Sequence, residues 1–241
     1  MVVRETPASK VLKEARELAR QHDYQAALEK YTWFHDHALE HDPAMAGVRL
    51  SYAVVEWVDL GEKFPPARVA LESVRDTKTQ ALEAGSEDVS LFFDVHAINR
   101  ALGEPERTRD LFALIAIGNR ELAQKCFMAA TDALVQTREF SLARSFLPAP
   151  DEDLKKLATP LNRAIRPRDL EPTGAGISFR DALISVYVRK VKMLLQILAG
   201  AGDEDEARRV HSAAIAIIED EESRHQVMSL LAPTLPSQRV Q

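Results

Sequence analysis

The stretch Leu18-Ala-Arg-Gln-His-Asp-Tyr24-Gln-Ala-Ala27-Leu-Glu-Lys-Tyr31 holds the pattern that decides the fold. A polar turn separates two helical patterns, and Asp23 is a typical N-cap for a helix that begins at Tyr24. Ala27 lies in the first turn of the returning helix, and the bulky Tyr31 follows four residues later. Two helices of a hairpin meet most closely near their turn, where only a small side chain fits. The stretch therefore predicts an antiparallel helical hairpin.

Four further segments share this pattern of a small or polar turn, a small residue in the returning helix and a bulky residue farther on. They are residues 57–71, 100–112, 130–146 and 198–207. The small residues Ala27, Ala67, Thr108, Ala143 and Ala207 are spaced 40, 41, 35 and 64 residues apart. All but the last spacing suit a unit of two helices. The sequence thus predicts about ten to twelve helices in hairpins joined by short turns.

Proline and glycine are placed as helix start and stop signals. Asp42-Pro43, Phe64-Pro65-Pro66 and Glu104-Pro105 put proline where a first helical turn accepts it. Glycine just past a periodic segment suits a left-handed C-cap, and four glycines have such positions: Gly61, Gly85, Gly103 and Gly202.

The first hairpin, with the residues that follow it, resembles a tetratricopeptide repeat (TPR). The resemblance rests on Ala15, Tyr24, Ala27, Tyr31 and the ending Ala38-Leu-Glu-His-Asp-Pro43, with four residues more than the consensus before that ending. It extends more weakly over about two thirds of the chain. It implies an all-α, right-handed α-α superhelix, or solenoid, of antiparallel hairpins that binds a protein or peptide. The lysine–asparagine clamp of the best-known peptide sites in the family is not supported, because asparagine is absent from the corresponding positions.

The chain divides by sequence into three segments. Residues 1–147 hold the TPR-like hairpins, residues 148–178 form an interruption rich in proline and glycine, and residues 179–241 hold closing helices and a short tail. The interruption predicts one helix at 151–164 and a loop at 166–178, either a long connection or a flap over a groove. Closing helices are expected at 179–198, 204–218 and 220–231, and a frayed tail at 233–241.

Composition supports this class of fold. Of the 241 residues, 46% are hydrophobic and only 6% aromatic, with 9 glycines and 12 prolines, which disfavours a β-sandwich or barrel and excludes collagen and a wholly disordered chain. The net charge of −6 lacks the basic excess of a nucleic-acid binder. No apolar run has the length of a signal peptide or a membrane span, so a cytoplasmic protein without a membrane partner is expected.

Candidate chemical groups are sparse in the sequence. The single Cys126 lies in an apolar helical stretch and is expected in the core. The cluster His35, His37 and His41 is interpreted as a solvated helix face rather than a metal site. The acidic runs at 203–206 and 219–222, and the pair Asp151 and Asp153, are expected at helix starts, where carboxylates favour the helix dipole.

Nucleotide-binding, nucleophile-elbow and Cys-x-x-Cys signatures are absent from the sequence. No cofactor, no metal and no catalysis are therefore expected. Trp33 and Trp57 are expected to pack between helices, with a groove-lining aromatic pocket as the alternative.

The predicted architecture points to binding. In stacked hairpins the first helix of each pair lines an extended surface. The repeat phase places eleven residues there: Arg16, Arg20, Ser51, Asp59, Arg100, Lys125, Asp132, Gln136, Arg189, Lys192 and Gln196. Their mixed charge suits a polar peptide, so the sequence predicts a non-catalytic protein- or peptide-binding adaptor or scaffold. The alternatives are a self-associating homodimer and a helical enzyme with a site between the groove and the 166–178 loop.

Overall fold

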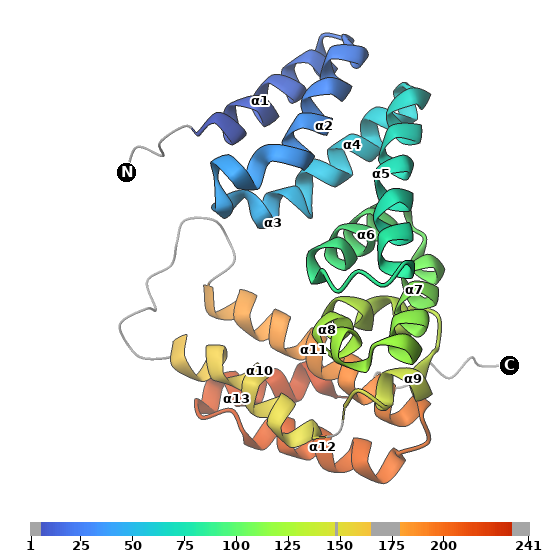
Figure 1. Cartoon of the computed structure of the whole chain (residues 1–241). Helices are drawn as coiled ribbons and strands as arrows, with labels where there is room; N and C mark the ends of the chain where they lie inside the picture. Colours follow the sequence, from blue (N-terminus) through green and yellow to red (C-terminus); the bar gives the residue numbers. More distant parts are fainter. Residues whose placement is uncertain (1–5, 148, 165–178, 233–241) are drawn as a thin grey trace, which may run out of the picture. The chain divides into compact units, whose positions relative to one another are not determined.

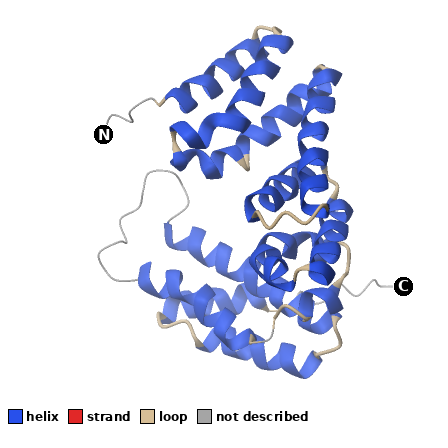
Figure 2. Cartoon of the chain, in the orientation of Figure 1, coloured by secondary structure: helices blue, strands red, loops and turns tan. Residues whose placement is uncertain are grey.

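The computed structural model describes residues 6–147, 149–164 and 179–232, and all regular structure among them is helical (Figure 2). The all-α class predicted from the sequence is thereby confirmed. The described residues form thirteen α-helices and one 3₁₀ helix, slightly more than expected, because the short α3 and α9 are separate elements. The loop expected at 166–178 and the tail expected at 233–241 lie outside the described residues.

Where the structure describes the connections, the helices follow one another with short turns (Figure 1). Up to residue 136 they are α1 (Pro7–Arg20), α2 (Tyr24–His41), η1 (Pro43–Met45), α3 (Ala46–Arg49), α4 (Tyr52–Lys63), α5 (Pro65–Glu83), α6 (Val89–Leu102), α7 (Pro105–Gly118) and α8 (Arg120–Gln136). Beyond it they are α9 (Phe140–Arg144), α10 (Pro150–Ala164), α11 (Phe179–Gly200), α12 (Glu204–Ala216) and α13 (Glu221–Leu231). The helix expected at 151–164 and the three closing helices are confirmed within a few residues.

The predicted turn signals lie at helix ends. The side chain of Asp23 accepts the backbone N–H of Ala26 at 3.3 Å and caps α2. Pro65 and Pro105 occupy the first positions of α5 and α7. A backbone N–H at that position has no partner within the helix, so proline, which lacks the N–H, costs no hydrogen bond there. Gly85, Gly103 and Gly202 have φ angles of 96°, 73° and 88°. All five segments with the repeated pattern therefore contain a real turn between two helices.

Gly61 is the exception, and the prediction that it ends a helix is wrong. It lies inside α4 and is buried. A Cβ atom at Gly61 would stand 2.9 Å from Cβ of Arg68 and 3.1 Å from its Cα, both on α5. Glycine is needed there because the two helices nearly touch beside their turn.

The chain forms two compact units, residues 1–133 and 134–241. This division falls inside α8, whereas the sequence suggested a first segment ending at residue 147. In the first unit α1 packs on α2, α4 on α5 and α6 on α7. Tyr31, Phe34 and Trp57 are buried in its core. The indole N–H of Trp57 donates to the carbonyl of Ala67 at 2.9 Å, so the expectation that Trp57 packs between helices is confirmed.

In the second unit the long helix α11 contacts α9, α10, α12 and α13. The buried Tyr187 of α11 donates its hydroxyl to the carbonyl of Ala214 at 2.8 Å. Helices α9 and α11 approach closely at Gly200, where a Cβ would stand 2.3 Å from the ring of Phe140 in α9. Ala207, where the sequence pattern placed the close contact, is only half-buried. No helix within the described ranges is both long and apolar enough to cross a lipid bilayer.

Candidate functional site

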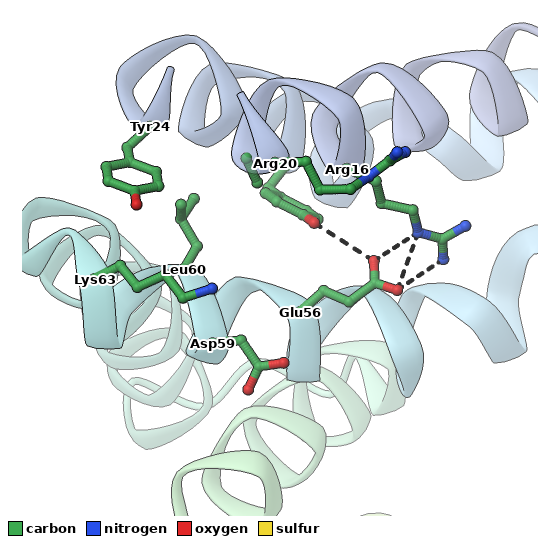
Figure 3. A pocket seen from close by; sticks show the side chains of 9 residues that line it. Arg16, Arg20, Tyr24, Glu56, Asp59, Leu60 and Lys63 are labelled. Carbon is green, nitrogen blue, oxygen red and sulfur yellow. Dashed lines mark hydrogen bonds and ion pairs between the residues drawn. The ribbon is translucent and has the colours of Figure 1, made fainter. Parts of the chain in front are cut away.

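A groove of about 290 Å³ lies on the first unit, where α1 and α2 face α4 (Figure 3). We call it the α1–α4 groove. It is lined by Arg16, Ala19, Arg20, Tyr24, Tyr31, Glu56, Asp59, Leu60 and Lys63. The hairpin turn at 21–23 sets its position, because it brings the end of α1 and the start of α2 together beside α4.

A bonded trio forms the inner part of this groove. The guanidinium of Arg16 on α1 donates from Nε to both carboxylate oxygens of Glu56 on α4, each at 3.0 Å, and a second nitrogen lies 2.9 Å from Oε1. The hydroxyl of the buried Tyr31 on α2 donates to the same carboxylate at 3.5 Å. Burial, and next the charge of Glu56, raise the pKa of Tyr31, so its hydroxyl remains a proton donor. The trio links three helices and fixes the shape of the groove.

The outer part of the α1–α4 groove carries exposed charges of both signs. Arg20 on α1 pairs with Glu17 at 2.7 Å, outside the groove. Asp59 and Lys63 on α4 are exposed, and neither forms an ion pair with the residues that the structure describes. Figure 3 shows Leu60 pointing from α4 toward the helices that carry Tyr24 and Arg20, with Asp59 and Lys63 below it on α4. The arrangement can bind a polar peptide through both charges and a short apolar contact.

Six of the eleven residues predicted from the sequence line grooves. Arg16, Arg20 and Asp59 lie in the α1–α4 groove. A second groove, on the second unit, includes Arg189, Lys192 and Gln196 of α11.

The other five predicted residues line neither groove. Ser51 precedes α4, where its hydroxyl donates to the carbonyl of Gly47 at 2.6 Å. Arg100 donates to the carbonyl of Leu50 at 3.1 Å, and Lys125 pairs with Glu121 at 2.8 Å. Asp132 and Gln136 are exposed on α8.

Tyr24, Glu56 and Lys63 of the α1–α4 groove were missed by the sequence reasoning. Lys63 follows Asp59 by four residues on one helix, a spacing that places the two on one face. Tyr24 was assigned to the repeat pattern and not to the binding surface. For Glu56 the periodicity holds no signal, because its partner Arg16 is 40 residues away on another helix.

A buried ionic cluster, unanticipated from the sequence, connects α2, α3, α5 and α6. Arg49 donates to the two carboxylate oxygens of Asp94 at 2.5 and 2.8 Å and to the backbone carbonyl of His35 at 2.5 Å. The ammonium of Lys78 donates to the same carboxylate of Asp94. His35, Arg49 and Asp94 are each less than a tenth exposed. The cluster ties residues far apart in the chain into one core.

The protonation states of this cluster follow from burial and charge. Burial, and next the charge of the neighbouring Arg49, lower the pKa of His35 to about 3, so the imidazole is neutral at neutral pH. Burial acts to raise the pKa of Asp94, but hydrogen bonds from Arg49 and Lys78 outweigh it and hold that pKa below its usual range. The expectation that His35 belongs to a solvated face is therefore wrong.

The remaining candidate groups are buried, stacked on another ring or placed at helix starts. Cys126 is fully buried, as predicted, and burial raises the pKa of its thiol to about 11. Trp33 stacks on His41 with ring centres 5.3 Å apart. The acidic runs begin α12 and α13, and Asp220 accepts the N–H of Ser223 at 2.8 Å as the N-cap of α13. Among the described residues, no three His, Cys, Asp or Glu side chains gather where a metal ion would fit.

No protein-family model, curated protein or solved structure matches the chain. The geometry of its own residues is therefore the basis for a functional proposal.

Proposed function

We propose that the chain is a non-catalytic helical-repeat module that binds a protein or peptide as an adaptor or scaffold. The observation that supports it best is the α1–α4 groove, where charged and aromatic side chains from three helices line one open recess. The proposal includes the finer expectation from the sequence, that the hairpins stack as a TPR-like right-handed superhelix. An experimental structure of the whole chain tests that part.

Preformed geometry is the mechanism by which such a groove would bind. Arg16 and Glu56 hold each other in place, and Tyr31 is fixed in the core beneath them. A ligand therefore does not need to order these side chains, which would otherwise cost ~0.5–1.5 kcal/mol for each long side chain immobilised. Arg20 and Lys63 then attract an acidic residue of the ligand, and Asp59 attracts a basic one.

Three buried groups with shifted pKa values, His35, Asp94 and Cys126, also suit a non-catalytic role. His35 and Asp94 are engaged in the buried ionic cluster, and the Cys126 thiol is enclosed in the core. A catalytic group must reach its substrate. These side chains instead bond to or pack against neighbouring helices.

Affinity capture from a lysate with three matched baits tests the proposal. The first bait is the unchanged chain. The second carries Arg20→Glu and Lys63→Glu, two exposed side chains of the α1–α4 groove. The third carries Lys10→Glu and Lys156→Glu, which change the net charge equally at exposed positions that do not line the groove.

We expect quantitative mass spectrometry to find a discrete set of proteins that bind both the unchanged chain and the control. The groove variant should recover these proteins in amounts at least about tenfold lower. Circular dichroism and thermal melting should show that all three baits are folded. Equal recovery by all three baits, or no protein enriched over an empty matrix, would contradict the proposal.

A further inference from the structure

The second groove, of about 360 Å³, runs along α11 beside α13 in the second unit. Six of the residues that line it carry the argument: Val188, Arg189, Lys192, Met193, Gln196 and Leu230. On α11 these residues recur at intervals of three and four, so they form one stripe along one helix face. We call this the α11–α13 groove. Its residues are all different from those of the α1–α4 groove, so it is a separate surface.

The cations of the α11–α13 groove have no acidic partner in the part of the chain that the structure describes. Arg189 and Lys192 are exposed, and among the described residues neither forms an ion pair nor shares the groove with an acidic side chain. Other arginines of this unit are paired: Arg144 with Asp203 at 2.5 Å, and Arg209 with Asp151 at 2.9 Å. The groove therefore presents two neighbouring positive charges in a chain whose net charge is −6.

Apolar surface lies directly beside these charges. Met193, which is half-buried, lines the groove from α11 above the buried Val188, and Leu230, which is 42% exposed, lines it from α13. An apolar strip bordered by charge is typical of a surface that another protein covers.

We infer that the α11–α13 groove docks an amphipathic helix of a partner protein, with acidic residues beside its apolar stripe. Charge complementarity selects acidic residues, because Arg189 and Lys192 are the charged groups that line the groove. A helix suits the surface better than an extended peptide. The backbone groups of α11 are bonded within the helix, so an extended peptide would find few partners for its own N–H and C=O groups.

The length of the stripe sets the size of the docked segment. From Ser185 to Gln196 the groove-lining residues span eleven helical steps, or about 17 Å. A partner helix of about three turns covers that distance. It would place leucine-like side chains against Met193 and Leu230 and carboxylates against Arg189 and Lys192.

Synthetic peptides bound to the full-length chain test this inference. The probe is a fluorescein-labelled helical peptide of about 16 residues, with leucine at every third or fourth position and glutamate on both flanks. Its twin replaces each glutamate by lysine. We expect fluorescence anisotropy to show saturable binding of the glutamate peptide, no binding of the lysine twin, and weaker binding as salt rises from about 50 to about 300 mM.

Matched variants locate the site. Arg189→Glu with Lys192→Glu should weaken binding of the glutamate peptide at least about tenfold. Arg189→Lys with Lys192→Arg should retain it, and so should Lys155→Glu with Lys156→Glu, a control on the exposed face of α10. All variants are first checked for an unchanged helical circular dichroism spectrum.

Three results would overturn the inference: no binding of the glutamate peptide, binding that the Arg189→Glu/Lys192→Glu variant leaves unchanged, or equal binding of both peptides. Vesicles with about 30% phosphatidylserine serve as the competing surface. Binding to these vesicles through Arg189 and Lys192, without peptide binding, would also overturn it and indicate a membrane surface instead. None of these results depends on the α1–α4 groove.

Discussion

At the residue scale, Asp94 holds the buried charges of Arg49 and Lys78 together in the core of the first unit. Its carboxylate is 4% exposed and accepts from both Arg49 and Lys78. Desolvating these three charges is costly, and only their mutual attraction and hydrogen bonds offset that cost. Removing one partner therefore has a larger effect than breaking a surface ion pair.

Asp94→Asn should lower the free energy of unfolding by about 3–5 kcal/mol, because it leaves Arg49 and Lys78 without a counter-charge in the core. Urea unfolding followed by circular dichroism measures this. The control is Glu121→Gln, which breaks the exposed pair with Lys125 and should leave the unfolding midpoint unchanged. If the two variants lost equally little stability, the cluster would have no structural role.

Two histidines with lowered pKa values predict loss of stability in acid. Burial lowers the pKa of His35 to about 3 and of His96 to about 4, whereas an unfolded histidine titrates near 6.5. As pH falls below about 6.5 the unfolded chain takes up protons that the folded chain does not, so stability decreases toward pH 3. Urea midpoints measured between about pH 7 and about pH 4 should fall steadily.

His96→Leu isolates one of these two contributions. Nδ1 of His96 is buried and has no hydrogen-bond partner among the described residues, so leucine removes a desolvated polar group. The variant should show a shallower loss of stability in acid than the unchanged chain. His225→Gln, at an exposed position on α13, should keep the original slope. A His96→Leu profile parallel to that of the unchanged chain would contradict the assignment.

The misassignment of His35 shows what sequence patterns miss at this scale. Ala27, Tyr31, Phe34 and Ala38 are all buried, and His35 falls on the same helical face. That spacing indicated burial, but the neighbouring His37 and His41 suggested a solvated cluster. The ion pair of Arg49 with Asp94 could not be predicted, since it joins helices 45 residues apart and depends on tertiary packing.

At the scale of helices, the sequence predicted the hairpins well because turn chemistry is local. An N-cap such as Asp23, a first-turn proline such as Pro105 and a left-handed Gly103 act within a few residues. Close contacts between helices are harder to predict from the sequence. Gly61 has the same sequence surroundings as a C-cap glycine, and only the packing of α4 on α5 shows that it is an interior contact.

Gly61→Ala should destabilise the first unit by about 1–3 kcal/mol. The added methyl would stand 2.9–3.1 Å from Cβ, Cα and N of Arg68, and backbone atoms cannot move aside as a flexible side-chain end can. Gly118→Ala is the control. An added Cβ there would meet no described atom within 4 Å beyond its chain neighbours and the backbone of its own helix, so alanine should add about 0.4–1 kcal/mol by restricting the unfolded chain. Thermal melts that shift in opposite directions would support this account, and a stabilising Gly61→Ala would contradict it.

At the scale of the whole molecule, the described residues of each compact unit form a groove, the α1–α4 groove on the first unit and the α11–α13 groove on the second. Helical phase predicted part of each groove, because residues such as Arg16 and Arg189 face outward from helices whose opposite sides are buried. It could not show which outward positions gather into a recess. That depends on the neighbouring helix, as with Glu56 in the first groove and Leu230 in the second.

The central claim is that the α1–α4 groove binds a protein or peptide, and site-specific photo-crosslinking tests it most directly. Benzoylphenylalanine replaces Tyr24, which lines the groove, or Tyr52, which is 70% exposed on α4 and does not line it. After irradiation in lysate, the account predicts a discrete crosslinked protein from position 24 that position 52 does not give and that Lys63→Glu abolishes. No adduct from position 24, or the same adducts from both positions, would contradict it.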